Sequence, residues 1–207
     1  MKTLLHVAVS PRLERSHSRR LAKEFIAAFL KRNPDYTIEE IDIGAVRQPR
    51  FGEAGAAAKF KSGRGIALDG AEAGEWNAAR VSFEQLKRAD RLVLSTPMWN
   101  FSMPWFLKQW IDRVTQAGWS FGVDPEKGYL PLLGGKKALF LCAAGSVYDT
   151  PEAQKLDHLR PYLRFWAEFN GLDAEFISLE GTNLGRELLE RNEAAARAEI
   201  AALAAEF

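Results

Sequence analysis

Two serines flank a histidine at the start of a predicted helix. A short loop that begins at Ser10 leads to Ser16, His17 and Ser18, and apolar residues at helical spacing then continue to about Lys31. The first backbone N–H groups of a helix have no acceptor within it, and the helix dipole is positive at that end. Serine hydroxyls add further donors. The arrangement is suited to a phosphate group, although capping of the helix by one serine would also explain it.

A stiff aromatic loop is the second candidate site. It follows the apolar run Leu92–Leu94, and a further proline, Pro104, precedes a helical pattern that extends to Val114. Prolines restrict the backbone at both ends of the loop, and in α/β proteins ligands bind outside the carboxyl ends of the strands. We therefore expect a wall for a flat aromatic cofactor, with loop packing or a subunit interface as alternatives. The loop residues are Pro97, Met98, Trp99, Asn100 and Phe101.

Strand-like and helical patterns alternate along the chain and must position these loops. The strands are predicted at Thr3–Val9, Thr37–Ile43, Arg91–Ser95, Ala138–Cys142 and Asp173–Leu179. The helices are predicted from Ser18 to about Lys31, around Trp76 to Asp90, after Pro104 to about Ala117, from Ala153 to Asn170, and from an N-cap at Asn183 onward.

This alternation is typical of an α/β fold with a parallel sheet and helices on both faces. For five strands, the simplest arrangement is the flavodoxin-like three-layer sandwich with strand order 2-1-3-4-5. That order places the strand tips at Ser10 and Thr96 side by side, so the two candidate sites adjoin. No linker or repeat divides the chain, and residues 1–207 are predicted to form a single domain.

Two segments show little periodicity. Arg47–Glu75 is rich in glycine and alanine and is predicted to be a long loop with a helix around Glu53–Lys61. Gly118–Leu133 is also predicted to be a loop. On the helix after Pro104, Asp112 and Arg113 are expected to form a salt bridge at a helix end or an interface.

The composition argues against several kinds of binding partner and site. Lys and Arg number 28 against 27 Asp and Glu, and a net charge of +1 gives no support for a nucleic-acid or membrane-surface partner. The single cysteine, Cys142, excludes an internal disulfide and is expected to be a small buried hydrophobe. The histidines lack metal-binding spacing, so no metal site is predicted. Without a membrane span or signal peptide, a cytoplasmic protein is expected.

Two motifs resemble a known family. Ser10-Pro11-Arg12 and Glu14-Arg15-Ser16-His17-Ser18 are similar to the phosphate loop of the FMN-dependent NADH-azoreductases, also described as NADH:quinone oxidoreductases. Pro97-Met98-Trp99-Asn100-Phe101, with Pro104 and the helix that contains Ile111-Asp112-Arg113, resembles that family's flavin-ring loop and the helix after it. The similarity runs in register from Leu4 to about Leu179.

The resemblance implies a flavodoxin-like homodimer that binds FMN non-covalently at the dimer interface. Ser10, Ser16, His17 and Ser18 would hold the phosphate, and Met98 to Phe101 would line the ring, largely through backbone groups. A third loop of the family, usually serine or threonine, arginine or serine, then two glycines, corresponds here to Ala143, Ala144, Gly145 and Ser146. Aromatic residues expected to stack on the substrate are Trp105, Phe121 and Tyr129.

The implied activity is a ping-pong transfer of two electrons, as hydride, from NADH or NADPH through FMN to quinones and azo compounds. An alternative is a flavin-binding electron carrier or redox sensor without turnover of its own. A relative that reduces free flavin, and one that has lost the cofactor, are further alternatives. The small-molecule substrate and a second copy of the chain are the only partners that the resemblance implies.

Overall fold

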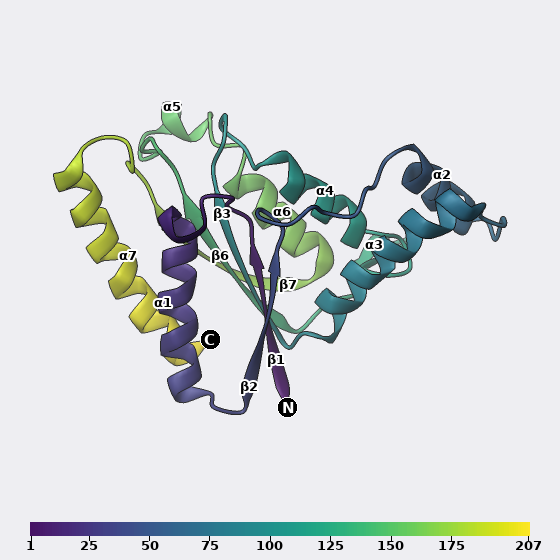
Figure 1. Cartoon of the computed structure of the whole chain (residues 1–207), viewed down its shortest axis with the longest axis horizontal. Helices are drawn as coiled ribbons and strands as arrows, with labels where there is room; N and C mark the ends of the chain where they lie inside the picture. The colour runs from purple at the N-terminus through teal and green to yellow at the C-terminus, as the bar shows by residue number, and fades with distance from the viewer.

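The central sheet has five parallel strands in the order β2-β1-β3-β6-β7 (Figure 1). The computed structural model describes all of residues 1–207. The strands are β1 (Lys2–Ala8), β2 (Tyr36–Asp42), β3 (Arg91–Pro97), β6 (Lys136–Ala143) and β7 (Leu172–Leu179). Since β6 and β7 are the fourth and fifth strands of this sheet along the chain, the predicted order 2-1-3-4-5 is confirmed. The strands formed where apolar runs were recognised, because a sheet covered on both faces buries continuous apolar segments.

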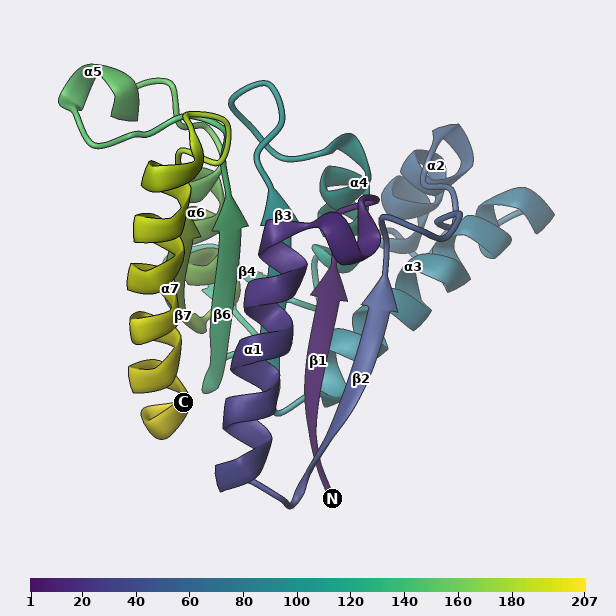
Figure 2. The same cartoon turned by 60° about the vertical axis from the view of Figure 1, so that its left-hand side comes forward.

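Helices cover both faces of the sheet (Figure 2). One face carries α1 (His17–Arg32) and α7 (Arg186–Glu206), whose apolar residues pack with Leu4 and Val93 in one buried cluster. The other face carries α3 (Gly70–Arg88), α4 (Trp105–Val114) and α6 (Arg160–Asn170), which contribute to a larger buried cluster that includes Trp110 and Phe140. The three-layer sandwich is therefore confirmed. None of the helices is both long enough and apolar enough to cross a membrane.

The segment Arg47–Glu75 is more helical than predicted. Helix α2 (Glu53–Ser62) matches the expected short helix, but α3 begins at Gly70, ahead of Trp76. Asp69 accepts a hydrogen bond from the backbone N–H of Glu72, and the Glu72 carboxylate accepts one from the N–H of Asp69, which forms a capping box. The spacing of these two acids was the signal for the helix start.

The segment Gly118–Leu133 contains a β-hairpin, so the prediction of a loop was wrong. Strands β4 (Phe121–Asp124) and β5 (Gly128–Pro131) pair antiparallel. The rings of Phe121 and Tyr129 lie 4.8 Å and 5.2 Å from the ring of Phe169 on α6. Strands of four residues are too short to establish a period-two pattern, and contact with α6 stabilises the hairpin instead.

The two remaining helix predictions also need correction. The predicted helix Ala153–Asn170 is broken into α5 (Pro151–Gln154) and α6, because Asp157 accepts hydrogen bonds from the N–H groups of Leu159 and Arg160 and starts a new helix there. Asn183 does not cap α7, because the N-cap residue of that helix is Gly185. The N–H of Asn183 instead donates to the Gly145 carbonyl at 3.2 Å.

Cys142 is buried on β6, as expected, and its thiol should be unreactive in the native protein. Burial raises the pKa of its thiol to about 12. Because the thiolate is the reactive form, the native protein is expected to leave Cys142 unmodified by a disulfide reagent near pH 8. Titration of thiols in native buffer and in denaturant checks this: one thiol per chain should appear only on unfolding. Rapid labelling of the native protein would contradict the burial explanation.

Candidate functional site

Three loops meet at the carboxyl ends of the strands (Figure 2). The loop after β1 lies beside β3, since the N–H of Val9 donates to the Ser95 carbonyl at 2.9 Å. The loop after β3 is tied to β6, since the N–H of Met98 donates to the Ala143 carbonyl at 2.8 Å, and Pro97 and Ala143 are paired residues of these strands. The junction of β1 and β3 is where the strand order reverses, and ligands bind at such positions in open α/β sheets.

The first loop presents serine hydroxyls and free N–H groups at the start of α1. Ser10, Ser16 and Ser18 are all buried, and the hydroxyl oxygens of Ser16 and Ser18 lie 3.2 Å apart. Ser16 also accepts the N–H of Arg19 at 3.4 Å, so it is the N-cap of the helix. The N–H groups of His17 and Ser18 have no acceptor in the protein. Capping occupies only a lone pair of the Ser16 oxygen, so both serine hydroxyls and the two N–H groups remain able to donate to an anion.

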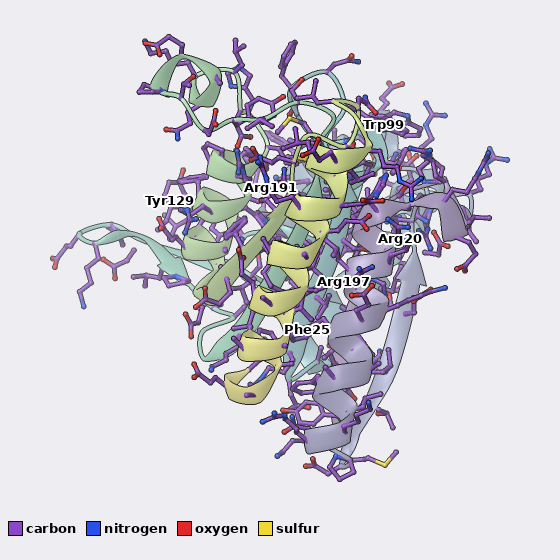
Figure 3. The ribbon with its side chains drawn as sticks, turned by 90° about the vertical axis from the view of Figure 1, so that its left-hand side faces the viewer. Arg20, Phe25, Trp99, Tyr129, Arg191 and Arg197 are labelled. Carbon is purple, nitrogen blue, oxygen red and sulfur yellow. The ribbon has the colours of Figure 1, made fainter.

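His17 is held by charged groups from two helices. Its Nδ1 lies 2.9 Å from the guanidinium of Arg20 and 3.4 Å from the carboxylate of Glu193 on α7. Arg20 can only donate to Nδ1, whereas the Glu193 carboxylate can only accept from it, and the contact with Arg20 is the shorter of the two. Burial and the charge of Arg20 lower the pKa of His17, which favours the neutral form of the ring. Figure 3 shows Arg20 where α1 faces α7.

An ion pair between buried Arg19 and half-buried Asp42 fixes the backbone of the first loop. The Arg19 guanidinium donates to the Ser10 carbonyl at 2.7 Å and pairs with Asp42 at the end of β2. Asp42 also accepts the N–H groups of Gly44 and Ala45, at 3.1 Å and 2.9 Å. Sequence reasoning missed both residues of the pair. The aspartate two positions before a glycine was a turn signal, but no pattern in the sequence connects it to Arg19.

The second loop is a tight turn in an unusual conformation. Trp99 and Ser102 exchange two backbone hydrogen bonds of 2.8 Å and 2.9 Å around Asn100 and Phe101, whose φ angles are +47° and +67°. This is the geometry of a type I′ turn, in which the left-handed conformation of a phenylalanine costs about 1–2 kcal/mol. The N–H groups of Asn100 and Phe101 have no acceptor, so the turn presents two donors at its tip.

The third loop also offers two free donors. The N–H groups of Gly145 and Ser146 have no acceptor, while their carbonyls accept hydrogen bonds from Asn183 and Gly181. A Cβ atom on Gly145 would lie 2.5 Å from Nδ2 of Asn183, so a side chain at this position would require Asn183 to move. Ala143 and Ala144, which precede these residues, are buried.

The second and third loops together line a cleft of about 230 Å³. Its lining includes predicted residues from both loops and one residue that sequence reasoning missed, Tyr148, which follows the third loop. The lining residues are Met98, Asn100, Phe101, Gly145, Ser146 and Tyr148. The structure thus brings the two predicted ring loops to one place.

A larger cleft, of about 570 Å³, has Trp99 in its lining. Trp105 lines it, but the other two predicted stacking residues do not. Phe121 and Tyr129 are on the β4–β5 hairpin, and Figure 3 shows Tyr129 well separated from Trp99. Within one chain, only Trp105 of this predicted group contributes to a cleft beside the loops.

Comparison with known proteins connects these loops to a family. The model of a family described as having a flavodoxin-like fold matches residues 2–204. An FMN-dependent NADH:quinone oxidoreductase of Nitratidesulfovibrio vulgaris is 37% identical over 188 residues, which cover 89% of each chain. FMN-dependent NADH:quinone oxidoreductase 3 of Pseudomonas fluorescens is 35% identical over 99% of this chain and 96% of its own length.

A solved structure supports the same family. An azoreductase of Bacillus anthracis superposes with a TM-score of 0.92 at 30% identity, covering 100% of both chains. The similarity therefore includes all three loops and the helices that follow them. With the sequence matches, it identifies this chain as a member of the flavodoxin-like family of FMN-dependent NADH:quinone oxidoreductases and azoreductases, and as an enzyme of that family.

Proposed function

We propose that this protein binds FMN non-covalently at the three loops and uses it to transfer two electrons from NADH or NADPH to quinones and azo compounds. The observation that carries the proposal is the set of free backbone N–H groups, two on each loop, at one edge of the sheet. The relatives named as FMN-dependent oxidoreductases support the same assignment.

The donors fit the two ends of FMN. At α1, the N–H groups of His17 and Ser18 and the hydroxyls of Ser16 and Ser18 match a phosphate, which accepts several hydrogen bonds and is favoured by the helix dipole. At the second and third loops, the free N–H groups can donate hydrogen bonds to a heterocycle that is rich in nitrogen and oxygen acceptors. Met98, Phe101 and Tyr148 supply apolar walls.

When bound, FMN supplies the hydride chemistry. The chain's own task is to hold and orient the ring and to stabilise its negative charge with fixed donors. Backbone N–H groups at Gly145 and Ser146 can do this even though Ala144 stands where the family usually has a polar side chain. No side chain is required as a nucleophile. Because donor and acceptor would occupy the same open cleft in turn, ping-pong kinetics are expected.

We further propose a homodimer whose interface covers the loops. Trp99, Phe101 and Trp105 are 39%, 50% and 69% exposed and lie together around the two clefts. Large exposed aromatic groups of this kind mark interaction surfaces.

Spectroscopy and kinetics test the proposal. The purified protein should show the visible absorption of bound flavin, lose that absorption within seconds of anaerobic mixing with NADH, and oxidise NADH steadily only when a quinone is present. Colourless protein that takes up no added FMN would overturn the cofactor assignment. Bound flavin that NADH does not reduce would indicate an electron carrier or sensor instead.

A further inference from the structure

Two arginines on the helices that cover one face of the sheet are wholly or partly removed from solvent, and they differ in their partners. Arg113 on α4 is buried but forms no ion pair, and the expected salt bridge with Asp112 is absent because Asp112 pairs with Lys108. Arg160, the first residue of α6, is half-buried and pairs with two carboxylates. Without the guanidinium these carboxylates would repel each other, so Arg160 is the group that keeps them together.

The first carboxylate connects Arg160 to the third loop. Glu180 follows β7; its Oε1 lies 2.5 Å from the guanidinium, and its Oε2 accepts the N–H of Tyr148 at 2.7 Å. The guanidinium carbon also lies 5.7 Å from the centre of the Tyr148 ring, within the range of a cation–π contact. Tyr148 is buried and lines the smaller cleft. The backbone and the ring of this cleft residue therefore both depend on the position of Arg160.

The second carboxylate connects Arg160 to the second loop. Asp157 is buried, and besides the guanidinium it accepts the N–H groups of Leu159 and Arg160 at 2.9 Å and 3.0 Å. The residue between Asp157 and Leu159 is His158, whose N–H donates to the Phe101 carbonyl at 2.9 Å. Phe101 lines the smaller cleft in a left-handed conformation that costs free energy. The bond from His158 therefore helps to keep the turn in this shape.

Arg160 itself does not line the smaller cleft. It lines a separate cavity of about 10 Å³, together with Ala144 and Glu180. Met98 lines both this cavity and the smaller cleft. Figure 2 shows the segment with α5, which joins the third loop to α6, at the same end of the sheet as the loop after β3. From this place Arg160 can act on a bound ring only through the groups that it holds.

We propose that Arg160 is a positioning residue of the flavin-ring site. Its two ion pairs hold Tyr148 and the turn at Phe101 in a fixed relation, so both walls of the smaller cleft are in place before a ring binds. Binding then orders less of the chain, which increases affinity without a contact between Arg160 and the ring. The inference rests on the proposed binding of FMN at the three loops and adds to it a residue outside the cleft.

The Arg160→Met variant tests the proposal, and Arg164→Met is its matched control. Arg164 lies about one turn further along α6, is exposed, forms no ion pair and has its guanidinium 4.6 Å from the centre of the Phe176 ring. The control therefore removes the same charge and a cation–π contact from the same helix. Arg160→Met should raise the Kd of FMN by about tenfold, because two loop segments must then be ordered on binding. The Kd of riboflavin, which has the ring but no phosphate, should rise by the same factor, and the control should leave both values unchanged.

Amide hydrogen exchange of the flavin-free protein is the second readout. In Arg160→Met the N–H groups of Tyr148 and His158 should exchange faster, while those of α1 keep the wild-type rates. Arg160→Lys keeps the charge but lacks the planar pair of donors, so it should show the same pattern with about a threefold rise in Kd. It replaces the methionine variant if that variant does not fold.

The outcomes are distinct. Unchanged exchange at Tyr148 and His158 would overturn the proposal, and so would faster exchange with unchanged flavin affinity, which would limit Arg160 to local stability. A rise in the Kd of FMN alone would also overturn it, because the effect would then lie at the phosphate. If the wild-type protein binds neither flavin while both N–H groups still respond to the variant, the proposed function fails and Arg160 still organises the cleft.

Discussion

Replacing both Ser16 and Ser18 with alanine is expected to weaken FMN binding by about 2–4 kcal/mol, which is roughly a 30- to 1,000-fold rise in Kd. Each hydroxyl is buried at the start of α1, and the two oxygens are 3.2 Å apart. A phosphate placed there can accept from both, and a hydrogen bond to a charged acceptor is about twice as strong as a neutral one. The measurement is the Kd of FMN by fluorescence quenching or calorimetry.

The single variants divide this effect into its parts. Ser16→Ala also removes the helix cap at the N–H of Arg19, so it should cost about 1 kcal/mol of folding stability in addition to affinity. Ser18→Ala leaves the cap intact and should lower affinity alone. Ser82→Ala is a suitable control, because this serine on α3 is also buried but bonds only the carbonyl of Ala78. Unchanged affinity in the double variant would show that only backbone donors and the helix dipole hold the phosphate.

The Arg19→Met variant is expected to lose about 3 kcal/mol of unfolding free energy. Arg19 is buried, so its removal leaves Asp42 without its partner and the Ser10 carbonyl without a donor. The exposed pair of Arg197 and Glu24 between α1 and α7 offers a matched control. Arg197→Met should cost less than about 1 kcal/mol, because water screens an exposed ion pair. Urea unfolding of both variants measures the difference.

The pH dependence identifies the ion pair as the cause. Burial alone would raise the pKa of Asp42, but the bonds from Arg19 and from the N–H groups of Ala45 and Gly44 outweigh it and lower the pKa below its ordinary value of 3.8. A carboxylate with a lowered pKa stabilises the fold above its unfolded pKa and loses that contribution as the pH falls through the folded value. The Arg19→Met penalty should therefore be full at neutral pH and shrink below about pH 4. A penalty that stayed constant on acidification would point to lost packing instead.

Much of the fold could be predicted because its signals are long and local. Apolar runs such as Thr3–Val9 and Arg91–Ser95 identified the strands, and alternation with helices restricted the topology enough to place Ser10 beside Thr96. The serines at α1 were recognisable because a helix start has a sequence signature. These features depend on residues that are close together in the chain.

The features that could not be predicted depend on tertiary contacts. Arg19 and Asp42 are 23 positions apart, and nothing in either local sequence indicates their pairing. The type I′ turn has asparagine at its first left-handed position, as usual, but phenylalanine where glycine is the common residue, so no turn signal was visible. The break before α6 depends on a single side chain, Asp157, that competes with the helix.

Buried Arg113 on α4 donates to the Pro49 carbonyl at 3.0 Å and to Oε1 of Gln48 at 2.9 Å, and this anchoring of the segment that carries Arg47 and Arg50 affects its tolerance of substitution. The loops proposed to hold the flavin end strands of the central sheet, whereas these two arginines lie on a connection that one buried side chain fastens to α4. Substitutions of exposed residues on that connection are expected to leave the sheet undisturbed. Substitutions at Arg47 or Arg50, which are both exposed, should therefore change the unfolding free energy by less than about 0.5 kcal/mol.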